Sequence, residues 1–124
     1  MIYLDTHVLV LLYLGGVEKM SPAARAAIEE NDLLVSPAAI LELECLHEIG
    51  RLRPTVSKVI SALASDVGLR VCELPFPTVV DQALQEKWGR DPFDRLIVAQ
   101  ARANKTPLVT KDEKIHRHYQ RAVW

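Results

Sequence analysis

The sequence predicts a three-layer α/β/α sandwich whose central parallel sheet has four to five strands. Short apolar runs alternate with segments of helical period along all 124 residues, a pattern that is typical of parallel strands joined by helices. Turn and capping signals separate the segments, and no repeat or linker interrupts them. Because domains of about 100 to 150 residues are common, we expect a single domain spanning residues 1–124.

Serine–proline pairs place two helices in the first half of the chain. Ser21-Pro22 and Ser36-Pro37 each supply a capping hydroxyl and a first-turn proline, and Gly50 is a residue type on which helices often end. The expected elements are a strand at 2–4, a helix at 7–14, a helix at 22–30, a strand at 33–35, and helices at 37–49 and 55–66.

Prolines and aspartates place the elements of the second half. Pro75 and Pro77 close an apolar run at 69–74, which is expected as the third strand, and Thr78 is the expected cap of a helix reaching Trp88. The remaining elements are a helix that begins at Asp91-Pro92 and extends to 104, a strand at 108–110, one or two helical turns at 112–120, and a short fifth strand at 122–124.

Composition excludes several classes of protein. The chain is 49% hydrophobic and 25% charged, as ordinary globular proteins are, which argues against disordered and fibrous architectures. Its longest apolar run has seven residues, 8–14, whereas a membrane helix needs about 20. Asp5 stands where a secretory signal would be basic, so a cytoplasmic protein is expected. Cys45 and Cys72 are too few for a disulfide framework and are expected as buried thiols.

Charge is distributed unevenly along the chain. Residues 87–124 contain nine Lys and Arg against four Asp and Glu, a net charge of +5, whereas residues 1–86 have a net charge of −6. A basic third in a chain of nearly neutral total charge suggests a face that can meet phosphates. The alternative, an ordinary solvated surface, stays open at this point.

Glu42 is a carboxylate at a position where the local pattern is apolar. A helical projection of residues 37–49 places Leu41, Cys45 and Ile49 on one apolar arc. Glu42 falls inside this arc, and the other glutamates of the helix lie outside it. Because an unpaired buried carboxylate costs several kcal/mol, we expect Glu42 to face a cation or to share a proton.

Asp94 repeats this pattern on another helix. Ile97, Val98 and Ala101 follow it at helical spacing and form an apolar stripe that Asp94 begins. A purely structural explanation also exists, since Asp91 is a good N-cap and an acid in the first turn is favoured by the helix dipole.

Asp5 and Asp112 follow two of the expected strands. The carboxyl ends of parallel strands meet at one edge of the sheet, where ligands bind in doubly wound folds. Taken singly, either aspartate could be an ordinary loop or capping residue. Together with Glu42 and Asp94, however, they can converge on one pocket.

Clustered carboxylates restrict the chemistry of such a pocket. Because their charges repel one another, they must take up protons or hold a divalent cation. Oxygen ligands without an inward-facing Cys or His favour Mg²⁺ or Mn²⁺ over Zn²⁺. Since such a cation can activate water and neutralise charge on a phosphodiester, hydrolysis of a nucleic-acid backbone is the expected reaction. Arg90, Arg95 and Lys111 flank the acids and are the expected phosphate contacts.

Four motifs carry a resemblance to a known family. They are Leu4-Asp5-Thr6-His7, Leu41-Glu42-Leu43, Asp91-Pro92-Phe93-Asp94-Arg95-Leu96-Ile97-Val98-Ala99-Gln100-Ala101 and Leu108-Val109-Thr110-Lys111-Asp112. In this order and spacing the chain resembles PIN domains, and most closely the VapC toxin ribonucleases of toxin–antitoxin pairs. The resemblance covers nearly the whole chain. It implies an endoribonuclease that depends on Mg²⁺ or Mn²⁺, an RNA substrate, a VapB-like antitoxin that covers the site, and a homodimer.

The resemblance also assigns residue roles. It implies that the catalytic and metal-binding acids are Asp5, Glu42, Asp94 and Asp112, and that Thr6 and Thr110 support them by orienting carboxylates or a metal-bound water.

Asp91 is a further catalytic candidate. Whether it binds the metal directly, binds it through water or only caps the helix is left open. His7, His116 and His118 are expected to lie beside the site or on the basic surface without a catalytic role. Trp88 and Phe93 are expected to pack at the ends of their elements rather than to stack on bases.

Two other functions are compatible with an acidic pocket at a sheet edge. A receiver-like phosphoacceptor domain has the same length and layers, but it resembles a pattern with paired acids after the first strand and a late Lys-Pro, and Asp5 is single and no late Lys-Pro occurs. A non-catalytic binding module is the second alternative, and the sequence does not exclude it.

Overall fold

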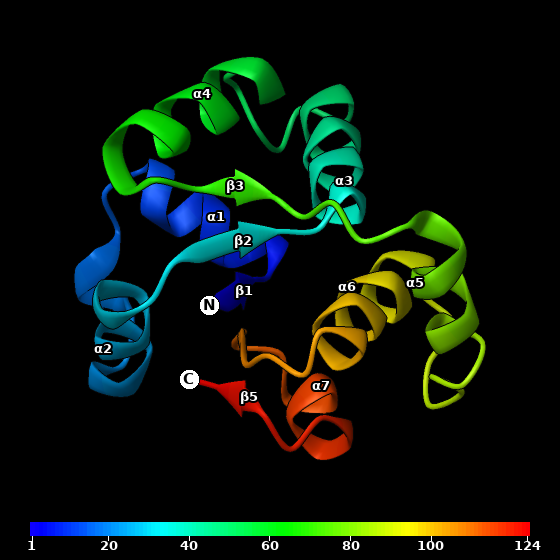
Figure 1. The fold of residues 1–124 in the computed structure, drawn as a ribbon. Helices are drawn as coiled ribbons and strands as arrows, with labels where there is room; N and C mark the ends of the chain where they lie inside the picture. The colour runs from blue at the N-terminus through cyan, green and yellow to red at the C-terminus, as the bar shows by residue number, and fades with distance from the viewer.

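The structure, a computed structural model that describes residues 1–124, contains a five-stranded sheet in the order β3-β2-β1-β4-β5. All four strand pairings are parallel. The strands are β1 (Ile2–Leu4), β2 (Leu33–Val35), β3 (Arg70–Val71), β4 (Leu108–Val109) and β5 (Ala122–Val123). Helices flank the sheet on both sides (Figure 1), so the predicted α/β/α architecture with four to five parallel strands is confirmed.

Strand β1 occupies the centre of the sheet and is completely buried. Tyr3 pairs with Leu34 on one side and with Leu108 on the other, and the exposed fractions of Ile2, Tyr3 and Leu4 are 1% or less. A strand covered on both faces requires a continuous apolar run instead of alternation. The first residues of the chain meet this requirement.

The helices follow the strands in chain order. They are α1 (Thr6–Tyr13), the 3₁₀ turn η1 (Val17–Lys19), α2 (Pro22–Glu30), α3 (Pro37–Glu48), α4 (Val56–Val67), α5 (Phe76–Ala83), α6 (Pro92–Ala103) and α7 (Glu113–His118). Helices α2 and α6 lie on opposite sides of the sheet (Figure 1). No helix has the length and apolar character that a bilayer span requires.

Side-chain caps begin several helices at the carboxyl edge of the sheet. Ser36 follows β2 and accepts a hydrogen bond from the backbone N–H of Ala38, 3.1 Å away, at the start of α3. Asp5 follows β1 and caps α1, and Asp112 follows β4 and caps α7. Because the strands are parallel, these turns all lie at the same edge.

The third strand is shorter than predicted. Of the run 69–74, only Arg70 and Val71 form the strand. The backbone N–H of Cys72 still reaches the Val35 carbonyl oxygen, but that of Leu74 points to the Cys72 sulfur, 3.5 Å away. The prolines that follow have no N–H to donate, so the ladder ends before them.

Helix α5 begins and ends earlier than predicted. It starts at Phe76 with Pro75 as its N-cap residue, so the expectation that Thr78 caps it is wrong. A proline is tolerated in the first helical turn, where its missing N–H would have had no partner, and Pro77 lies inside that turn. The helix ends at Ala83 instead of reaching Trp88, because the chain then turns to bury Glu86.

The buried face of α3 is centred elsewhere than the helical projection indicated. Ala39 and Leu43 are fully buried, whereas Leu41 is 58% exposed and Ile49 is 64% exposed. Cys45, also placed on the predicted arc, is only partly buried. Helix α3 contacts α1, α4 and α6, and the side that carries Ala39 and Leu43 is its buried one. Exposed apolar residues such as Leu41 are common on protein surfaces.

Truncation of α3 side chains tests this orientation. We expect Leu43→Ala to lower the free energy of unfolding by about 2 to 5 kcal/mol, because it leaves a cavity in the core. Leu41→Ala, two residues away on the exposed face, should change it by less than about 0.5 kcal/mol. Urea unfolding followed by circular dichroism measures both, and equal effects of the two variants would contradict the assigned face.

Candidate active site

Asp5 is a buried carboxylate at the end of the central strand. Asp5 is only 5% exposed. One of its carboxylate oxygens accepts a hydrogen bond from the Thr6 backbone N–H at 2.8 Å, and the other accepts one from the Thr110 hydroxyl at 2.6 Å. Burial raises the pKa of Asp5, and the nearby charge of Asp112 raises it further, while these hydrogen bonds oppose the shift.

Glu42 reaches the same place from helix α3. The hydroxyl of Thr6 donates a hydrogen bond to Glu42 Oε1, so Thr6 contacts Asp5 through its backbone and Glu42 through its side chain. Partial burial raises the pKa of Glu42, and the charges of Asp5 and Asp91 add to this effect. Although the projection misplaced the buried face, Glu42 lies at its border and turns inward.

Asp94 is half-buried on α6, near the other acids of the cluster. Burial raises its pKa to about 7, and the charges of Asp91, Asp5, Asp112 and Glu42 all add to the rise. The apolar stripe that follows it on α6 is fully buried, as predicted. Besides Asp91 on its own segment, Asp94 therefore has acids from three other segments near it, at the ends of β1 and β4 and on α3.

Asp91 and Asp112 have a second task as helix caps. One oxygen of Asp91 accepts hydrogen bonds from the N–H groups of Phe93 at 2.8 Å and Asp94 at 3.3 Å. One oxygen of Asp112 accepts from Ile115 N–H at 2.9 Å. In both residues these caps occupy only one of the two carboxylate oxygens, so capping does not exclude a further ligand.

The donor chemistry of the cluster fits a hard divalent cation. Its five acids offer oxygen ligands, and no Cys is among them. As the side chains are placed, no three His, Cys, Asp or Glu side chains stand close enough together to hold one ion. Mg²⁺ usually takes only one or two carboxylates and completes its shell with waters and phosphate oxygens, so a hydrated cation suits this arrangement.

The three cations predicted to contact phosphates have different surroundings. Arg90 is exposed on the segment that leads into α6. Arg95 is partly buried, and its guanidinium donates to the Ala83 carbonyl oxygen at 2.9 and 3.3 Å, which closes the end of α5. Lys111 is exposed, with its Nζ 5.8 Å from the centre of the Trp124 ring. Arg90 and Lys111 are therefore the two with freely accessible charges.

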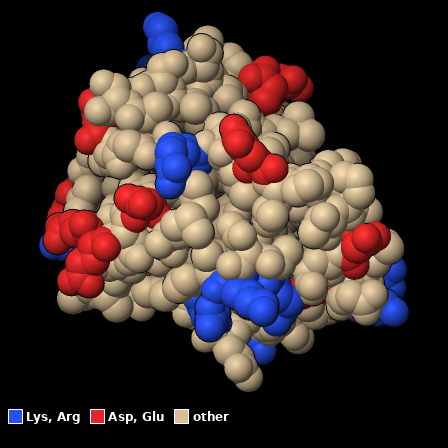
Figure 2. Space-filling view, in the orientation of Figure 1, with Lys and Arg blue, Asp and Glu red and all other residues tan.

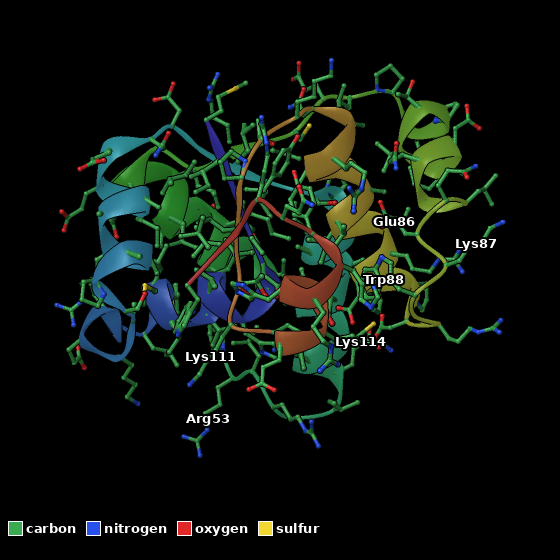
Figure 3. All side chains as sticks on the ribbon, turned by 90° about the horizontal axis from the view of Figure 1, so that it is seen from below. Arg53, Glu86, Lys87, Trp88, Lys111 and Lys114 are labelled. Atoms are coloured by element: carbon green, nitrogen blue, oxygen red, sulfur yellow. The ribbon has the colours of Figure 1, made fainter.

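A buried glutamate that the sequence analysis did not single out, Glu86, holds the segment that leads into the site. Glu86 is 3% exposed and accepts hydrogen bonds from Trp88 Nε1 at 2.7 Å and from Arg102 Nε at 2.5 Å. These contacts fasten the segment between α5 and α6 (Figure 3), which carries Arg90 and Asp91. No local pattern marks Glu86, because its partner Arg102 is sixteen residues away.

Histidines and aromatic residues pack around the cluster. The Trp88 ring stacks on His118 with 5.2 Å between ring centres, so it packs within the protein as expected. His116 Nε2 lies 2.7 Å from the Thr110 carbonyl oxygen. His7 is exposed beside the acids, and its charge opposes the upward pKa shifts of Asp5 and Glu42.

Comparisons with solved structures identify similar folds. A chain of a toxin–antitoxin complex from Klebsiella pneumoniae aligns over 100% of this chain and 97% of its own length, with a TM-score of 0.67 and 16% identity. A chain of VapBC2 from Rickettsia felis, bound to a promoter DNA fragment, aligns over 94% and 92%, with a TM-score of 0.62 and 18% identity. A chain of VapBC-1 from nontypeable Haemophilus influenzae aligns over 98% of this chain and 92% of its own length, with a TM-score of 0.54 and 19% identity.

Sequence comparison places the chain in a family. No curated protein matches it significantly. The PIN domain family matches residues 2–120, which is nearly the full length and includes all the clustered acids. The chain therefore belongs to the PIN domain family.

Proposed function

We propose that the protein is a metal-dependent endoribonuclease that hydrolyses RNA phosphodiester bonds. The observation that carries this proposal is the half-buried carboxylate of Asp94 with other carboxylates near it: burial raises its pKa to about 7, with a further contribution from the charges of Asp91, Asp5, Asp112 and Glu42. Such a cluster is costly in the absence of a cation and becomes favourable when one binds. Membership of the PIN domain family, together with the resemblance to VapC toxins, supports a nuclease in preference to a receiver domain.

The acids would share the work of holding Mg²⁺ or Mn²⁺. The cation would be bound, directly or through its waters, by Asp5, Glu42, Asp94 and Asp112. Asp91 would contribute the carboxylate oxygen that does not cap α6. When bound, a divalent cation lowers the pKa of a coordinated water and offsets charge on a phosphodiester oxygen.

The threonines would act by fixing the acids. The Thr6 hydroxyl donates to Glu42 and the Thr110 hydroxyl donates to Asp5 at 2.6 Å, so each carboxylate presents its remaining lone pairs in a fixed direction. Arg90 and Lys111 would contact the phosphates on either side of the scissile bond. Arg95, whose guanidinium is bonded to the Ala83 carbonyl, would reach a phosphate only at the rim of the site.

The solved structures similar to this chain are of toxin–antitoxin complexes, two of them VapBC complexes. On this basis we propose that the protein is the toxin of such a pair, with a VapB-like antitoxin covering the acids. A homodimer is proposed from the same resemblance. Because the proposed substrate is RNA, the protein would act in the cytoplasm.

Amide substitutions of the acids test the nuclease directly. We expect Asp5→Asn and Glu42→Gln each to reduce Mg²⁺- or Mn²⁺-dependent RNA cleavage by at least about 100-fold, because each removes a charge that attracts the cation. Glu44→Gln is the matched control on the same helix and should cleave within about twofold of the unsubstituted protein. Cleavage is measured on a labelled single-stranded RNA, with circular dichroism confirming the fold.

Undiminished cleavage by both acid variants would contradict the assignment. Failure of the unsubstituted protein to cleave RNA with either cation would favour the non-catalytic binding module instead.

The raised pKa values predict how stability depends on pH. Between about pH 4 and 7 the folded protein binds more protons at Asp94 than the unfolded chain does, so this group lowers stability as pH rises. The raised pKa values of Glu42 and Asp5 act in the same direction. In a chelating buffer, Asp94→Asn should therefore raise Tm more at pH 7.5 than at pH 5. Differential scanning calorimetry of both proteins measures this difference.

Addition of Mg²⁺ should raise the Tm of the unsubstituted protein more at pH 7.5 than at pH 5, since the carboxylates must be ionised to bind it. A Tm difference between Asp94→Asn and the unsubstituted protein that grows toward acid pH would contradict the raised pKa assigned to Asp94.

A further inference from the structure

A basic pocket lies at the C-terminal end of α6, whereas Asp91 and Asp94 lie at the N-terminal end of this helix. Its volume is about 240 Å³, and it is lined by Arg102, Lys105, Tyr119, Gln120 and Arg121. Figure 2 shows Lys and Arg side chains gathered in this part of the surface, over the α7–β5 end of the molecule. Three of the five lining residues are cations and none is an acid, so the pocket suits an anion.

The pocket holds its cations in defined positions. Arg102 donates from Nε to the buried Glu86 at 2.5 Å and from Nη2 to the His118 carbonyl oxygen at 2.9 Å, and its guanidinium carbon lies 4.9 Å from the centre of the Tyr119 ring. Arg121 donates to the Lys105 carbonyl oxygen. Neither Lys105 nor Arg121 takes part in an ion pair, so their charges are not neutralised by the protein.

Lys105 has a backbone conformation that lysine rarely adopts. Its φ angle is +54°, and it is the only residue other than glycine with a positive φ. It follows the C-cap residue Asn104 of α6, where the left-handed conformation is usual and glycine is strongly preferred. A strained residue kept at such a position suggests that its side chain is used.

Helix α7 connects the acid cluster to this pocket. Asp112 caps its first turn at the carboxyl edge of the sheet, and Arg121 precedes β5 at the opposite edge. Lys114 and Arg117 are exposed between them, and the exposed Lys111 directly precedes Asp112. Figure 3 shows Lys111 and Lys114 at the same end of the molecule. The stretch of chain that joins the two sites therefore carries further exposed positive charges.

We propose that Arg102, Lys105 and Arg121 bind a backbone phosphate of the RNA strand whose scissile bond lies at the acid cluster, several nucleotides away along α7. This inference rests on the proposed nuclease function and adds a second anchoring point for its substrate. Arginine and lysine contacts to phosphates fix the register of a strand without reading its bases. The pocket therefore favours RNA long enough to span both sites.

Binding of two RNA lengths tests the pocket. The protein carries Asp5→Asn, which prevents cleavage, and fluorescence anisotropy compares a 15-nucleotide single strand with a 4-nucleotide one in Mg²⁺. We expect Lys105→Gly and Arg121→Gln each to weaken binding of the longer strand about threefold to tenfold. Each should also reduce the slope of log K against log salt concentration by about 0.7 per lost phosphate contact. Binding of the shorter strand should not change. Lys58→Ala, which removes an exposed lysine on α4, is the control and should leave both affinities unchanged.

Stability measurements separate loss of contact from loss of fold. Lys105→Gly should have a Tm at least equal to that of the parent, because glycine adopts the left-handed conformation without strain. Weaker RNA binding in a protein that is no less stable would support the pocket, and Arg121→Gln gives a second test at an unstrained position.

Three other outcomes are distinguishable. Equal affinities of all variants for the longer strand would overturn the pocket, whatever the acid substitutions do to cleavage. Inorganic phosphate could raise the Tm of the parent protein but not that of the Lys105 and Arg121 variants, while all of them bind RNA equally well. This result would identify a site for a free anion and overturn the RNA assignment. The expected binding pattern in a protein that cleaves no RNA would support the pocket and contradict the nuclease.

Discussion

The buried carboxylate of Asp5 is the constraint on which the rest of the site depends. A carboxylate this deeply buried must be hydrogen-bonded or paired. Pairing of β1 with β4 brings the Thr110 hydroxyl within 2.6 Å, while the turn into α1 supplies the Thr6 N–H at 2.8 Å. The sheet register thus decides which side chains can reach the pocket, and Thr6 extends the same network to Glu42 on α3.

Charge repulsion within this network gives the site its chemical character. Hydrogen bonds satisfy part of the capacity of Asp5, whereas at Asp94 burial, together with the charges of the other acids, raises the pKa to about 7. If the proposed cation binds, it would offset this cost and stabilise the fold. The basic residues proposed to anchor the RNA strand, Lys105 and Arg121 among them, lie in a pocket outside the acid cluster, where they would offset the charge of a bound phosphate backbone instead of that of the carboxylates.

Local signals in the sequence were sufficient for much of this arrangement. Fully buried strands and side-chain caps are encoded within a few residues, so β1, β2 and the starts of α2, α3 and α6 could be predicted. Tertiary packing decides the rest. Which face of α3 is buried depends on its packing against α1, α4 and α6, and the chain leaves α5 after Ala83 and turns to where Glu86 pairs with the distant Arg102. The convergence of the acids on one cation stays a prediction: their charges raise the pKa of Asp94, but no three of the side chains stand close enough together to hold one ion.

A crystal soaked in Mn²⁺ would test the central claim, a cation shared by the clustered acids, more directly than any activity measurement. The account predicts an anomalous difference peak about 2.1 Å from a carboxylate oxygen of Asp5 or Asp94, with the other acids contacting it directly or through ordered waters. A fully occupied peak elsewhere, or a structure in which the acids stay apart with no peak between them at saturating Mn²⁺, would contradict it.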